Sequence, residues 1–159
     1  MDLQAEYDLD FHAWLNKNAE LLRDGRLTEI DGEHIAEELE SMGKRDLRQL
    51  RSRLQVLVMH LLKWQYQPEK QSKSWLATIE HQRDEIEALL LDSPSLRGKL
   101  EVGLEMVYPK AVRDASRDTG LSDEVFPSRG DSKLKESLDK PLRPQTFLIK
   151  RELTRSQSH

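Results

Sequence analysis

The stretch from Leu47 to Trp64 constrains the fold more than any other part of this sequence. Its large apolar residues recur in steps of three and four, the spacing of one face of an α-helix. They are Leu47, Leu50, Leu54, Leu57, Leu61 and Trp64. From Leu54 onward the other directions of the helix are also apolar, with Val56, Val58, Met59 and Leu62. A helix that is apolar all round is covered by neighbours, which predicts the central helix of a bundle or a helix covered by a second subunit.

Helix start and stop signals divide the rest of the chain. Asp8 is the expected cap of a first helix that ends near Gly25, and Asp31 is the expected cap of the long central segment. The central segment ends at Pro68, and Gly43 marks either a kink or a break within it.

Two more helices are expected after Pro68. Ser72 or Ser74 caps the first of them, and the dipeptide Ser93-Pro94 opens the second. Pro109 predicts a kink in this last helix, and Gly120 its end.

These signals predict an all-α fold. We expect a compact bundle of four main helices with a long central helix, followed by short C-terminal helices at 122–127 and 131–138, over residues 5–139. Residues 140–159 hold five basic residues and one acidic residue, and we expect a basic, flexible extension there. The net charge of -4 is too small to predict a nucleic-acid or membrane partner from the overall field.

Composition excludes several classes of function. The chain has no cysteine, which removes disulfides, thiolate metal sites and cysteine nucleophiles. No apolar run approaches the length of a membrane span, and the acidic N-terminus lacks the apolar core of a secretory signal. We therefore expect a cytoplasmic protein with no membrane contact. We expect no cofactor and no metal, because pairs such as His34 and Glu38 or His81 and Glu85 are typical of solvated helix faces.

Polar side chains interrupt the apolar surface of the central helix. Gln55, His60 and Lys63 lie within it, and Arg53 precedes His60 by seven residues, which places both on nearly the same face. One interpretation is a histidine with its hydrogen bonds satisfied in the core beside a lysine that reaches solvent. The other is an imidazole and a guanidinium that together transfer a proton or bind an anion.

Several sequence blocks resemble one known family. They are Glu37-Glu38-Leu39-Glu40-Ser41-Met42-Gly43, Met59-His60-Leu61-Leu62-Lys63-Trp64-Gln65-Tyr66-Gln67-Pro68-Glu69, Ser74-Trp75, Thr78-Ile79, Gln82-Arg83, Asp92-Ser93-Pro94-Ser95-Leu96 and Phe126-Pro127. Together they resemble the uncharacterised bacterial family catalogued as domain of unknown function number 29, over about residues 5–139. The resemblance implies a compact helical bundle and no known activity.

The same blocks indicate a polar corner where the central helix meets its successor. A short connection between antiparallel helices brings together the end of one and the start of the next. The expected members are His60, Lys63, Gln65, Tyr66, Ser74, Trp75, Gln82 and Arg83. This corner is either a polar network that fixes the helix pair or the lining of a small pocket.

Three functions remain open on this basis. We favour a helical interaction or regulatory module, without catalysis, that self-associates or binds a protein partner. The first alternative is a ribonuclease, because Arg53 and His60 are similar to the Arg-x(4–6)-His motif of the HEPN helical nucleases. The second is nucleic-acid binding without catalysis, through the basic run from Lys44 to Arg53.

Overall fold

A computed structural model describes residues 2–128 of the chain, and these residues form helices and turns without a strand. The predicted all-α class is therefore confirmed. These described residues divide into two compact units, and the boundary between them falls between Asp46 and Leu47. One long helix, α3 (Gly32–Tyr66), belongs to both units.

The first unit contains α1 (Leu3–Leu9), α2 (Phe11–Arg23) and the beginning of α3. The prediction that Asp8 caps the first long helix is wrong, because Asp8 lies inside α1, a helix that we did not expect. The cap of α2 is Asp10, whose side chain accepts a hydrogen bond from the backbone N–H of Ala13 at 3.0 Å. Gly25 follows α2 with a φ of 71°, the left-handed conformation that the sequence indicated.

Helix α3 is continuous through Gly43, so this glycine does not break it. Gly43 does not have a positive φ, unlike Gly25 and Gly120. The residues around it are good helix formers that hold it in the helical conformation. Asp31 caps α3 as expected, since its Oδ1 accepts from the backbone N–H of His34 at 3.4 Å. Beyond Gln67, Pro68 opens a short 3₁₀ helix, η1 (Pro68–Lys70).

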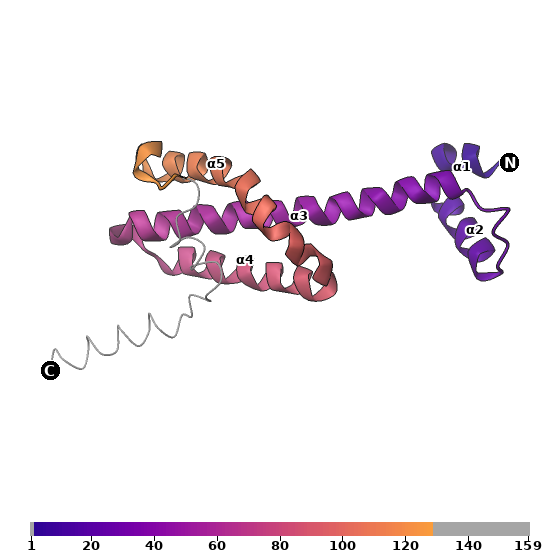
Figure 1. Ribbon diagram of the computed structural model, residues 1–159, viewed down its shortest axis with the longest axis horizontal. Coiled ribbons are helices and arrows are strands. Elements are labelled where there is room, and N and C mark those ends of the chain that lie inside the picture. Colours follow the sequence, from indigo (N-terminus) through magenta and orange to yellow (C-terminus); the bar gives the residue numbers. More distant parts are fainter. Residues whose placement is uncertain (1, 129–159) are drawn as a thin grey trace. The chain divides into compact units, whose positions relative to one another are not determined.

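The second unit continues with α4 (Lys73–Asp92), which Ser72 caps, and then returns through η2 (Pro94–Lys99) to α5 (Leu100–Thr119). We expected the last main helix to begin at Ser93-Pro94. The structure instead places a 3₁₀ helix there and begins α5 at Leu100. Helix α5 continues past Pro109, and its ribbon bends along its length (Figure 1). Gly120 ends it with a φ of 74°.

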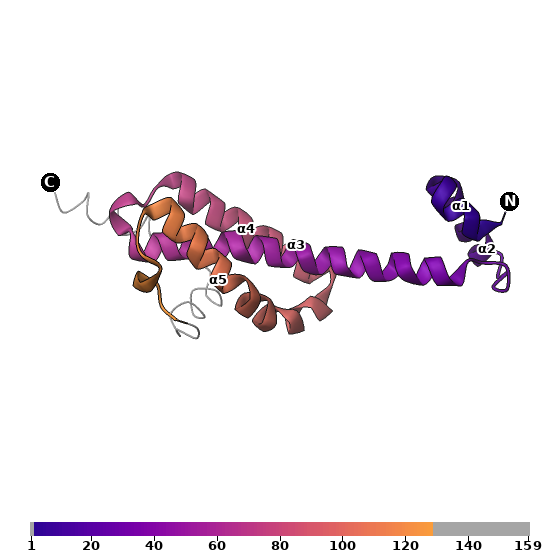
Figure 2. The same cartoon turned by 90° about the horizontal axis from the view of Figure 1, so that it is seen from above.

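Two apolar clusters hold the second unit together. In the first, Leu57 and Leu61 of α3 pack with Ile79 and Ile86 of α4. In the second, other residues of α3 pack with α5 and the turn after it; the members are Val58, Leu62, Ala111, Ala115 and Phe126. Figures 1 and 2 both show α4 and α5 beside the C-terminal half of α3. The predicted burial of the central helix is therefore confirmed in this half, where Val58, Leu61 and Leu62 are fully buried.

A short 3₁₀ helix, η3 (Asp123–Val125), is the last described element, in the region where we expected a helical turn at 122–127. The short helix expected at residues 131–138 and the basic extension at 140–159 lie outside the described residues. Among the helices of residues 2–128, none has the length and apolar character needed to cross a membrane.

Candidate functional site

Lys63 is the centre of the polar corner. Lys63 as a whole is 6% exposed, and it lies near the C-terminal end of α3. The ammonium group lies 3.2 Å from Oδ2 of Asp118 in α5 and 4.6 Å from the ring centroid of Trp75 in α4. A carboxylate and the face of an indole ring both stabilise a buried cation. Lys63 therefore links all three helices of the second unit.

Two glutamines close the corner. The amide of Gln67 donates to the carbonyl of Thr119 at the end of α5, at 3.5 Å, and the amide of Gln71 donates to the carbonyl of Trp64 at 2.9 Å. Both carbonyls belong to helix ends, where backbone acceptors lack helical partners. Sequence reasoning missed both glutamines and Asp118, although Gln67 lies inside the block that drew attention to the corner.

The other expected members of the corner are only partly brought together. Tyr66 packs edge-on against Phe126, with ring centroids 5.5 Å apart, and Ser74 and Gln65 are exposed. Gln82 lies further along α4, where it accepts a hydrogen bond from Arg53 at 3.3 Å. Burial lowers the pKa of Arg83, the neighbour of Gln82. The corner thus consists mainly of Lys63, Trp75 and Asp118 with the two glutamines, whereas Tyr66 packs on the segment after α5.

Arg53 and His60 have different surroundings in spite of their shared helix face. The guanidinium of Arg53 lies 3.2 Å from a carboxylate oxygen of Glu85 in α4. Nδ1 of His60 donates to the backbone carbonyl of Val56 at 2.9 Å. Burial is the main cause that lowers the pKa of His60, and the charge of Lys63 lowers it further. At neutral pH this imidazole is therefore uncharged.

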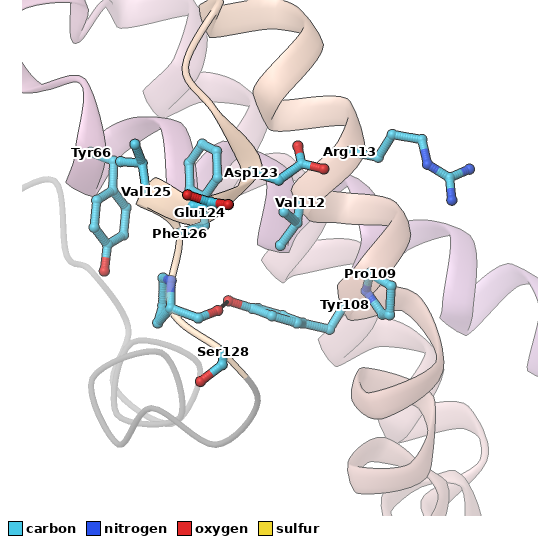
Figure 3. A pocket seen from close by; sticks show the side chains of 11 residues that line it. Tyr66, Tyr108, Pro109, Val112, Arg113, Asp123, Glu124, Val125, Phe126 and Ser128 are labelled. Carbon is cyan, nitrogen blue, oxygen red and sulfur yellow. Dashed lines mark hydrogen bonds between the residues drawn. The ribbon is translucent and has the colours of Figure 1, made fainter.

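An open cavity of about 850 Å³ lies beside the corner, between α5, the end of α3 and the segment around η3 (Figure 3). Tyr66, Tyr108, Val112 and Phe126 supply its apolar wall, and Arg113, Asp123 and Glu124 are also among its lining residues. The hydroxyl of Tyr108 donates to the carbonyl of Pro127, and that of Ser116 donates to the carbonyl of Leu121 at 2.6 Å. These bonds fix the segment after α5 against the helix.

A second polar cluster, in the first unit, surrounds the buried Asp31. Its Oδ2 accepts from Nε1 of Trp14 at 3.0 Å and from Nδ1 of His34 at 2.6 Å. The amide of Asn18 completes the set by accepting from the backbone N–H of Asp31 at 2.8 Å. The hydrogen bond that His34 donates to the carboxylate of Asp31 raises the pKa of His34. The donors to Asp31, above all those of His34 and Trp14, lower its pKa against the opposing effect of burial.

Tyr7 extends this cluster to the surface. Its ring stacks on that of His34 with centroids 4.0 Å apart, and its hydroxyl donates to Oε1 of Glu38 at 2.5 Å. This hydrogen bond is the largest cause that raises the pKa of Tyr7 to about 12. The carboxylates in this cluster have protein donors, and within residues 2–128 no group of three histidine or acidic side chains is arranged to hold a metal ion.

The part of α3 that follows this cluster is exposed on every side. From Leu39 to Asp46 each residue is exposed, and the two apolar members, Leu39 and Met42, are 63% and 55% exposed. These two residues are three positions apart and therefore lie on one face of the helix. No described hydrogen bond or ion pair within residues 2–128 involves the side chains of Lys44 or Arg45.

Comparison with known proteins yields one finding. A family model matches residues 6–142, and its description is "Domain of unknown function DUF29". Comparison with curated proteins and with solved structures gives no match.

Proposed function

Because the chain belongs to the DUF29 family, whose description assigns no activity, we propose a function from its own surfaces: it is a protein-interaction module that docks another protein on the exposed part of α3. This proposal concerns Leu39 to Asp46. It assigns no reaction to the protein.

The observation that supports the proposal is the complete exposure of this helical segment. Helices in proteins owe most of their stability to an apolar face that packs on something else, and short helices without such packing are marginal in water. The segment also contains Gly43, which costs about 1 kcal/mol relative to alanine in a helix interior. A partner seated on Leu39 and Met42 would supply the missing packing.

Other exposed apolar residues have a different setting. Leu91 of α4 and Val102 of α5 are 68% and 54% exposed, but each of these helices buries another face in the core of its unit. Singly exposed apolar side chains are ordinary on protein surfaces. Between Leu39 and Asp46, in contrast, α3 buries no residue at all.

The polar residues favour the same proposal over catalysis. Lys63, Arg53 and His60 each have a partner within the chain, at Asp118, Glu85 and the carbonyl of Val56. Catalytic groups must reach a reacting molecule in a common space. The contacts of Lys63 and Arg53 join α3 to its neighbouring helices, and the contact of His60 lies within α3 itself.

A photo-crosslinking residue tests the proposal directly. It is placed at Met42 in one version of the full chain and at Lys44, on the opposite side of the same helix, in the control. Illumination in the cells that produce the protein should yield a covalent adduct with a protein from position 42 and little from position 44. Absence of any adduct from position 42, or equal yields from both positions, would refute the proposed docking face.

A further inference from the structure

We propose that the protein docked on the exposed part of α3 is a second copy of this chain, whose own α3 runs antiparallel to the first. This inference rests on the proposed function and specifies the partner. Three features of the segment from Ala36 to Asp46 are self-complementary when the helix is turned end for end: its apolar stripe, its charges and its small residues.

The apolar stripe comes first. Leu39 and Met42 are its exposed members, and Ile35, one turn earlier, is half-buried within the first unit. A two-fold axis that passes midway between Leu39 and Met42 places Leu39 of one copy at the level of Met42 of the other. The same residues then form both sides of the contact, as a two-fold interface requires.

The charges select the direction of the second helix. Glu38 and Arg45 are seven positions apart, so they border the same side of the stripe, one on each side of the axis. In the antiparallel arrangement Glu38 of each copy lies within one turn of Arg45 of the other, which gives two ion pairs. A parallel arrangement about a two-fold axis would instead place Glu38 and Arg45 of one copy against the side of the other copy that carries Ala36 and Gly43, and neither ion pair would form. Charge complementarity therefore favours the antiparallel pair.

Small residues border the other side of the stripe. Ala36 and Gly43 are also seven positions apart and exposed, and in the antiparallel arrangement Ala36 of one copy approaches Gly43 of the other. An added Cβ at Gly43 would meet no atom of its own chain within 4 Å, so the space beside it is open to a neighbour. Helices approach closely where the residues between them are small.

The chain's own contacts leave these groups available. Within the described residues the side chain of Arg45 has no hydrogen bond or ion pair, and Glu38 uses Oε1 for Tyr7, which leaves Oε2 for a second donor. Two turns of helix form a small interface, and small interfaces are typical of weak, exchanging complexes. We therefore expect a reversible equilibrium between monomer and dimer.

Sedimentation equilibrium over a wide concentration range tests the inference on the full chain. The wild type should show a monomer–dimer equilibrium, and Leu39→Lys should abolish it. Arg45→Glu should weaken it about tenfold, because each of two ion pairs becomes a repulsion. Lys44→Glu makes the same kind of charge change on the opposite side of the helix, so it should leave the equilibrium unchanged.

Mixing two variants tests the direction of the helices. Glu38→Arg and Arg45→Glu should each weaken self-association, whereas an equimolar mixture should dimerise at least as well as the wild type, because both cross-pairs are again of opposite charge. A wild type that remains monomeric, equal behaviour of Arg45→Glu and Lys44→Glu, or no rescue on mixing would each overturn the inference.

Two controls separate the possible failures. Tyr7→Phe removes the internal hydrogen bond to Glu38 without changing the charge, and circular dichroism of every variant identifies any that fails to fold. Self-association of Tyr7→Phe should match that of the wild type. If the crosslinker at Met42 labels only a different protein, the second-copy inference fails and the docking function stands. If it labels nothing, both fail.

Discussion

The ion pair between Lys63 and Asp118 allows a prediction in which the two partners respond unequally. The side chain of Lys63 is 8% exposed and that of Asp118 is 43% exposed, so only one end of the pair depends on the other for solvation. Removing Asp118 leaves a buried ammonium group without its carboxylate. Removing the charge of Lys63 leaves a carboxylate that water can reach.

The expected magnitudes follow from this asymmetry. Loss of one partner of a fully buried pair costs about 3–5 kcal/mol. The half-exposed position of Asp118 and the remaining contact of Lys63 with Trp75 reduce this, so Asp118→Ala should cost about 1–3 kcal/mol. Lys63→Met keeps an unbranched apolar stem of similar length and removes the buried charge. Its effect should stay within about 1 kcal/mol.

Urea unfolding followed by far-ultraviolet circular dichroism measures both effects, provided that the slope with denaturant is unchanged between variants. The double variant with Lys63→Met and Asp118→Ala should resemble Lys63→Met alone, because no charge is then stranded. The reasoning would be refuted if Lys63→Met destabilised the protein as much as Asp118→Ala. In that case the ion pair itself, and not the desolvation of one end, would stabilise the corner.

Four further predictions concern other parts of the chain. Asp31→Ala should lower the stability of the first unit by about 2–4 kcal/mol, since it removes a helix cap and leaves the buried indole N–H of Trp14 without an acceptor. Faster amide hydrogen exchange in α2 would reveal this loss. Hydrogen exchange of the first unit should also depend on pH. The pKa of His34 is raised, so its contribution to the stability of the first unit is present below its ordinary pKa of 6.5 and is lost as the pH rises through the raised value. The pKa of Asp31 is lowered, so its contribution to stability is present above its ordinary pKa of 3.8 and is lost as the pH falls through the lowered value. His34→Gln should remove the loss at high pH and keep the loss at low pH. Gly43→Ala should slow hydrogen exchange in residues 39–46 and stabilise the helix by up to about 1 kcal/mol, since nothing lies within 4 Å of the added Cβ; unchanged exchange would contradict this. Purified protein and its His60→Ala variant should show the same background level of RNA cleavage, and a wild-type activity that the variant lacks would instead support the ribonuclease alternative.

Local signals in the sequence predicted the parts of the fold that depend on local chemistry. Asp31 and Gly120 were recognised as helix ends, and Ser72 was one of two serines expected to cap α4, because capping and left-handed conformations depend on one side chain or its absence. The same reasoning failed at Asp8, because Asp8 and Asp10 both precede apolar residues and sequence alone does not rank two caps so close together.

Contacts between distant segments were the harder part. The approach of Lys63 to Trp75 was predictable, since a short connection joins the two helices. Asp118 is 55 residues from Lys63, and its position depends on how α5 packs after the 3₁₀ helix that replaces its expected first turns. The contact of Tyr7 with Glu38 was missed for the same kind of reason, because it requires the unexpected helix α1.

The distribution of the three tryptophans follows from the fold and has a practical consequence. Trp14 lies in the first unit, where its indole donates to Asp31, whereas Trp64 and Trp75 lie in the second unit beside the Lys63 corner. With excitation at wavelengths that tyrosine does not absorb, a chain with Trp64 and Trp75 replaced by phenylalanine would therefore emit only from the first unit, and a Trp14→Phe chain only from the second. Intrinsic fluorescence can thus follow each unit separately within the full-length protein, without an added label.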